Sequence, residues 1–183
     1  MGKDYTCFDE KHPEFGDQYY YALINLFDLE TREKKTEIFK FYDQRSLISG
    51  YCFNEYVVAR YLLFKGYDCF RFDKKISRFF RRPTIQLLRH LFNRKEEFKE
   101  ILVERGLSDR FLPLLNKPGV PDLIVVVEGE FFCVEVKTES DSLRKSQVEW
   151  WCECPRDIPF KIAYVEVRTS PSANWFNGLV LGD

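Results

Sequence analysis

Two short apolar runs separated by three residues constrain the fold of this chain more than any other feature. The first run covers residues 123–127, the second covers 131–136, and Glu128-Gly129-Glu130 lies between them. Both runs are rich in Val, Ile and Phe and are too short for ordinary helices. The sequence therefore predicts two strands joined by a tight turn.

The register of this hairpin would bring three polar residues together. A two-residue turn at 128–129 places Asp122 directly across from Glu135. Lys137 would share their face, because side chains alternate between the two faces along a strand. A three-residue turn would break this register, so the expectation depends on the length of the turn.

Two acids and a lysine at the open end of an apolar hairpin are costly to hold together unless a cation lies between the carboxylates. Oxygen ligands with vacant positions suit Mg²⁺ or Mn²⁺. The alternative is a solvated hairpin end, where acids and lysines are common. The order of the motifs favours a functional site: Pro-Asp at a strand start, a hairpin, Glu-Val-Lys at its end, and a helix carrying Gln147.

Pro121-Asp122 followed by Glu135-Val136-Lys137 resembles the signature of the PD-(D/E)xK nuclease superfamily. Within that superfamily the chain looks like the VRR-NUC family of virus-type replication and repair nucleases. The residues that carry this narrower resemblance are Gly119-Val120-Pro121-Asp122, Asp141-Ser142-Leu143 and Gln147. The similarity is densest over residues 119–151 and weaker over 49–73 and 160–168.

The resemblance implies an α/β fold: a restriction-endonuclease-like core with a mixed central sheet flanked by helices. It also implies hydrolysis of a DNA phosphodiester by a metal-dependent site. Asp122, Glu135 and the backbone carbonyl of Val136 would bind Mg²⁺ or Mn²⁺, and Lys137 would position or deprotonate the attacking water.

A helical pattern runs from about residue 52 to 65 and ends at Gly66. Glu55 falls on the same stripe as Val58, Ala59 and Leu62. A glutamate on a core-facing stripe needs a partner. Glu55 is therefore either a rim residue paired with Lys or Arg or, as the resemblance implies for an acid on the first core helix, a residue that lines the metal site.

Residues 138–141 form a polar break before another helical pattern, and Ser140 or Asp141 could cap that helix. One face of the helix would carry Leu143, Gln147, Trp150 and Trp151. Gln147 would then face the sheet, and the family resemblance implies that it lies beside the acids and positions Lys137 or a water molecule. The alternative is an ordinary polar residue at a helix edge.

The strongest local charge lies in residues 71–95, which contain nine basic residues and one acidic residue, although the whole chain has a net charge of -1. Interleaved phenylalanines suit stacking beside phosphate contacts. The alternative is a solvated basic helix face. The expected DNA contacts are Lys74, Lys75, Arg78, Arg81, Arg82 and Arg89.

A chain of 183 residues is long enough for one domain with a sizeable core. We expect an N-terminal extension with a β-hairpin (residues 1–48, strands near 18–28 and 36–42), a nuclease core (49–168) and a C-terminal tail (169–183). The core would hold strands at 67–73 and 160–167. A basic helical insert at about 74–116 would hold helices at 95–105 and 109–115.

The chain has no apolar run of membrane-spanning length and no signal-peptide pattern at its start. These features predict a soluble intracellular protein, cytoplasmic or nuclear, or in a host cell if the chain is viral. The six cysteines lie mostly in apolar stretches and are interpreted as reduced core residues.

The predicted function is a metal-dependent DNA endonuclease of recombination or repair. The resemblance alone suggests a branched substrate, such as a Holliday junction or a flap. Junction cutting would favour a homodimer, whereas flap cutting would work with a monomer. The alternatives are a restriction-like duplex nuclease and a non-catalytic DNA-binding module that retains the fold.

Overall fold

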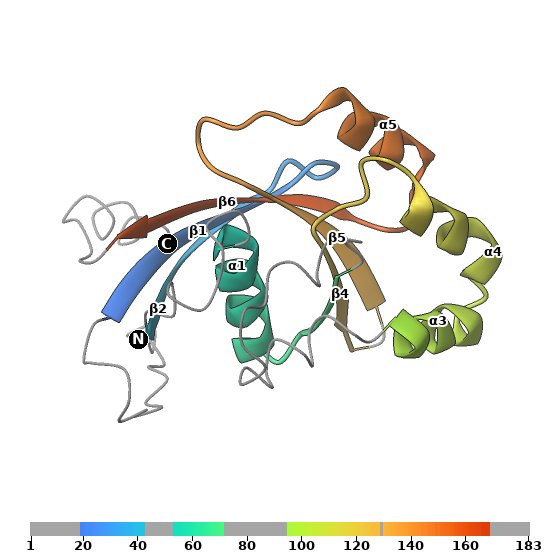
Figure 1. Ribbon diagram of the computed structural model, residues 1–183, viewed down its shortest axis with the longest axis horizontal. Helices are drawn as coiled ribbons and strands as arrows, with labels where there is room; N and C mark the ends of the chain where they lie inside the picture. Colours follow the sequence, from blue (N-terminus) through green and yellow to red (C-terminus); the bar gives the residue numbers. More distant parts are fainter. Residues whose placement is uncertain (1–18, 43–52, 72–94, 129, 169–183) are drawn as a thin grey trace.

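The computed structural model describes residues 19–42, 53–71, 95–128 and 130–168. They form a mixed α/β structure in which one curved six-stranded sheet carries helices on both faces (Figure 1). The mixed α/β class expected from the sequence is confirmed.

The sheet has the strand order β2-β1-β6-β5-β4-β3. β5 and β6 are parallel, and every other neighbouring pair is antiparallel. A parallel pair needs a crossover connection, and here the segment containing helix α5 supplies it. The strands are β1 (Tyr19–Asp28), β2 (Lys34–Tyr42), β3 (Asp68–Phe70), β4 (Leu123–Val127), β5 (Glu130–Lys137) and β6 (Phe160–Arg168).

The N-terminal hairpin expected before the core is confirmed, and it continues the central sheet. β1 pairs with β2 on one side and with β6 on the other. The turn between β1 and β2 is closed by Asp28, whose carboxylate accepts hydrogen bonds from the backbone N–H groups of Glu30 and Thr31. The hairpin therefore packs as a sheet extension.

The helices divide between the two faces of the sheet, as Figure 1 shows for α1 and α5. α1 packs its apolar residues against one face, while aromatic residues of α3, α4 and α5 form a second core on the other face. The helical elements are α1 (Phe53–Phe64), α3 (Lys95–Glu104), α4 (Ser108–Phe111), the 3-10 helix η4 (Leu112–Asn116) and α5 (Lys145–Glu153).

Strand β5 carries alternate residues into the two cores. Val134 faces α1, whereas Phe131 and Cys133 face the second core with α5. Because the alternation has a period of two residues, Glu135 and Lys137 continue the row on the α5 side. Two charged side chains thus lie at the end of an apolar row, under a helix.

The helices expected at 95–105 and 109–115 are confirmed as α3 and the α4–η4 pair. Residues 72–94 lie outside the described part of the chain. All six predicted DNA contacts therefore lie outside it as well: Lys74, Lys75, Arg78, Arg81, Arg82 and Arg89. None of the helices that the structure describes is long and apolar enough to cross a membrane.

The predicted start of α5 was wrong. Asp141 does not cap this helix, because its carboxylate accepts hydrogen bonds from the backbone N–H and the hydroxyl of Thr138, at 3.0 and 2.7 Å. These local bonds close a turn. The helix begins only at Lys145, so Leu143 precedes it. Cys152 also departs from expectation because it is exposed, whereas Cys154 is buried.

Candidate active site

The hairpin has the register that a two-residue turn predicts. Val127 pairs with Glu130 at the turn, and Leu123 pairs with Val134 at the other end. One step further, Asp122 stands opposite Glu135, and its carboxylate Oδ2 accepts a hydrogen bond from the N–H of Val136 at 2.8 Å. The side chain of Asp122 thus extends the ladder where the backbone of β4 has ended.

Asp122 and Glu135 form a pair of carboxyl groups with little access to solvent. Glu135 is 1% exposed. Burial, followed by the nearby charge of Asp122, raises its pKa to about 8. Burial also raises the pKa of Asp122, against the opposing effects of the Val136 N–H and of nearby positive charges. The charge of Asp122 therefore makes ionisation of Glu135 more costly.

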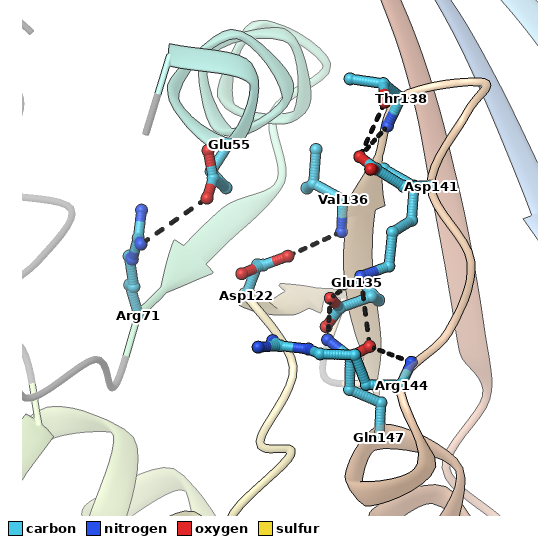
Figure 2. Close-up of polar contacts among 10 residues, drawn as sticks. Glu55, Arg71, Asp122, Glu135, Val136, Thr138, Asp141, Arg144 and Gln147 are labelled. Carbon is cyan, nitrogen blue, oxygen red and sulfur yellow. Dashed lines mark hydrogen bonds and ion pairs between the residues drawn. The ribbon is translucent and has the colours of Figure 1, made fainter. Parts of the chain in front are cut away.

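A lysine and a glutamine hold one oxygen of Glu135. Lys137 Nζ lies 2.9 Å from Glu135 Oε1. Lys137 Nζ also donates to Gln147 Oε1 at 3.1 Å, and the amide Nε2 of Gln147 donates to Glu135 Oε1 (Figure 2). The backbone N–H of Arg144 donates to the same Gln147 oxygen at 2.8 Å. Gln147 is 1% exposed, so it is not a solvated residue at a helix edge.

The position of Gln147 depends on how α5 is anchored. Trp150, one turn further along the helix, is buried and donates from its indole Nε1 to the backbone carbonyl of Leu114 at 2.8 Å. Its ring packs edge-on against Phe111. A salt bridge between Lys117 and Glu153 also joins α5 to the segment that follows η4. The aromatic core thus fixes the helix that holds Gln147.

Trp150→Phe is expected to lower the free energy of unfolding by about 1–3 kcal/mol, because the indole hydrogen bond to Leu114 is lost and the smaller ring leaves a cavity. The carbonyl of Leu114 keeps its hydrogen bond from the backbone N–H of Lys117. Urea unfolding of the two proteins measures this difference. Trp151→Phe is the matched control, since Trp151 is only partly buried. An equal loss in both variants would contradict the anchoring role of the indole.

Glu55 and Arg71 form a second pair beside Asp122 (Figure 2). The Arg71 guanidinium lies 3.9 Å from Glu55 Oε1. Burial raises the pKa of Asp122, and the positive charge of Arg71 opposes that rise. Arg71 is buried, one residue beyond β3. One of the two alternatives predicted for Glu55 was pairing with a Lys or Arg, and Arg71 is that partner.

Arg71 belongs to the site although the sequence placed it only in the basic segment. Within the described residues, no group of three or more His, Cys, Asp and Glu side chains is close enough to hold a metal ion. Glu55 therefore lies apart from the carboxyl pair, and it contacts Arg71, the residue whose charge acts on Asp122. The sequence did contain a signal that Arg71 points inward. In the alternating strand pattern of residues 67–73, Arg71 lies on the same face as Cys69, which is buried.

Comparison with protein families identifies the domain that contains this geometry. Residues 78–167 match the model of the VRR-NUC domain, a range that includes the β4–β5 hairpin, α5 and nearly all of β6. The chain carries a VRR-NUC domain. The domain implies a nuclease of the PD-(D/E)xK type, and hence an enzyme that binds DNA. No curated protein and no solved structure matches the chain.

The donor atoms in the VRR-NUC domain fit a hard divalent cation. Glu135 Oε2 is buried and accepts no hydrogen bond from the residues that the structure describes. Close to a second carboxylate, such an oxygen needs either a proton or a cation. Val136 adds a third oxygen, because the C=O and N–H of a strand residue point to the same side and its N–H points toward Asp122. Three oxygens without soft ligands suit Mg²⁺ or Mn²⁺.

Proposed function

We propose that this protein is a metal-dependent DNA endonuclease whose site is built on a restriction-endonuclease-like core. The observation that supports this proposal most strongly is the Asp122–Glu135 pair, in which Glu135 is buried and Asp122 is partly buried. One oxygen of Glu135 lacks a donor among the described residues, and the other lies 2.9 Å from Lys137 Nζ. Burying charge in this way lowers the stability of the fold, so the arrangement fits a cation site better than a structural ion pair.

Asp122, Glu135 and the carbonyl oxygen of Val136 would hold Mg²⁺ or Mn²⁺. A bound ion of this kind supplies neutralisation of phosphate charge and lowers the pKa of a coordinated water. Glu55 would support the site through Arg71, whose positive charge favours the ionised form of Asp122. The buried arginine would thus keep one carboxylate ready for the cation.

Lys137 would orient the attacking water and stabilise the negative charge that develops on the phosphate. Two acceptors, Glu135 Oε1 and Gln147 Oε1, fix its ammonium group. Gln147 would hold the lysine in place through its own bond to Glu135.

The proposed substrate is branched DNA, such as a Holliday junction or a flap, in recombination or repair. The basic residues of segment 72–94, which continues directly from Arg71, would contact the phosphates. A four-way junction has two strands to cut, so it would favour a homodimer, whereas a flap would not.

The proposal is tested by incubating the protein with four DNA substrates at equal concentration: a four-way junction, a flap, a linear duplex and a single strand. Cleavage is expected in Mg²⁺ or Mn²⁺ and should disappear with a chelator, the branched substrates being cut fastest. Equal cutting of the linear duplex would favour a restriction-like nuclease. Tight DNA binding without cleavage of any substrate would instead support a non-catalytic module.

A further inference from the structure

Gly119 lies three residues before Asp122, and its backbone rests against the first turn of α5. Its φ is +88°, a left-handed conformation that favours glycine. A Cβ built at this position would lie only 2.8 Å from the backbone nitrogen of Gln147, and closer still to the carbonyl oxygen of Ser146. Cβ atoms essentially never approach other atoms below 3.0 Å. Only a glycine allows the two segments to come this close.

The obstacles to a side chain at Gly119 are backbone atoms, so no change of rotamer could relieve the clash. Either the segment leading to Asp122 or the first turn of α5 would have to move. The later part of α5 is held separately by the Trp150 indole and by the Lys117–Glu153 salt bridge. A side chain at position 119 would therefore tilt the first turn away from the sheet while the rest of the helix stays docked.

Gln147 lies in that first turn. Its side-chain amide donates to Glu135 and accepts from Lys137. A tilt of the turn would lengthen both bonds, because β5 holds Glu135 and Lys137 on the central sheet. Misplacing catalytic groups by about 1 Å can cost about 100-fold in rate.

We propose that Gly119 is a positioning residue of this site. Its lack of a side chain lets the first turn of α5 approach the segment before Asp122, and this approach sets the Gln147 amide against Glu135 and Lys137. The catalytic consequence rests on the proposed nuclease function. The structural consequence does not.

The test compares Gly119→Ala and Gly119→Asn with the same substitutions at Gly66. Gly66 has a similar φ of +81°, but a Cβ there would meet no atom within 4 Å. Both positions therefore share the backbone strain, and only position 119 adds the clash. The Gly66 variants should cleave DNA at the wild-type rate, whereas the Gly119 variants should lose about 100-fold.

A double variant separates positioning from general damage. If Gly119 acts through Gln147, then Gly119→Ala combined with Gln147→Ala should cleave no more slowly than Gln147→Ala alone. Multiplied losses in the double variant would overturn the proposal. Loss of the native fold in both Gly119 variants, with both Gly66 variants folded, would also overturn it, since the role would then be purely structural.

A second measurement needs neither DNA nor metal. The side-chain amide signals of Gln147 in ¹H–¹⁵N NMR are identified by their absence from Gln147→Ala. In Gly119→Ala they should move to the positions of solvent-exposed amides, and in Gly66→Ala they should stay. Unmoved signals in Gly119→Ala would overturn the proposal. If the signals move in Gly119→Ala but the wild-type protein cuts no DNA, the positioning role is retained and the nuclease function is rejected.

Discussion

Lys137→Met is expected to lower the rate constant of DNA cleavage by about 100- to 10,000-fold, the range for loss of a positioned acid–base group. Methionine keeps the unbranched apolar stem of the buried side chain but removes the ammonium group. The water would lose its orienting group, and the phosphate would lose a nearby positive charge. Single-turnover cleavage of the fastest-cut substrate at saturating Mg²⁺ measures the change.

The matched control for this variant is Lys145→Met, which removes a lysine from the exposed side of α5. The side chain of Lys145 is 90% exposed and pairs only with Glu149 among the described residues. The control should cleave at the wild-type rate and melt at the wild-type temperature. Equal rates for Lys137→Met and wild type would show that the lysine is no part of the reaction. A pH–rate profile that keeps its shape in Lys137→Met would assign the base elsewhere.

Glu135→Gln is expected to abolish metal-dependent cleavage and, in the same protein, to raise stability in the absence of metal. The folded-state pKa of Glu135 is about 8, whereas the ordinary value is 4.5. Below pH 4.5 the carboxyl group is protonated in both the folded and the unfolded chain, so its pKa shift costs nothing. Between pH 4.5 and 8 the unfolded chain releases a proton that the folded chain retains, and stability falls as the pH rises.

The glutamine variant does not lose this stability, since its side chain stays neutral. At pH 8 in a chelator, Glu135→Gln should be more stable than wild type by on the order of 1–3 kcal/mol, and at pH 4 the two should be equal. A gain of this size raises the melting temperature by roughly 2–4 °C per kcal/mol. Glu139→Gln, at an exposed position in the turn after β5, is the control and should follow wild type.

Adding Mg²⁺ or Mn²⁺ should reverse the order of these stabilities. Wild type gains the free energy of metal binding in the folded state, whereas the variant has lost a ligand. If metal raises the melting temperature of Glu135→Gln as much as that of wild type, then Glu135 is not a metal ligand. Parallel pH profiles for the two proteins in chelator would contradict the buried carboxyl pair itself.

Much of the site follows from local geometry that the amino-acid sequence predicts. The two-residue turn and the period of two fix Asp122 opposite Glu135 and place Lys137 on their face, and this register is confirmed. The period of the helix turned Gln147 toward the sheet, where it is buried. The same regularities predicted the N-terminal hairpin and the helices at 95–105 and 109–115, which the structure has as α3 and the α4–η4 pair.

The prediction of where α5 begins was wrong because two sets of local hydrogen bonds compete for the same carboxylate. Asp141 is a good capping residue by type, but it is used by Thr138 in the preceding turn. Both arrangements satisfy the same carboxylate. Only the path of the chain between β5 and α5 decides which one forms.

The sequence by itself determined the hairpin, its register and the carboxyl pair, because those relations depend on residues within one strand or one turn. The tertiary structure alone decided that Arg71 joins Glu55 to Asp122, and that Gly119 meets the backbone of Ser146. These contacts join segments far apart in the chain. Their distances depend on how two faces of a sheet are packed, and no periodicity in the sequence encodes that packing.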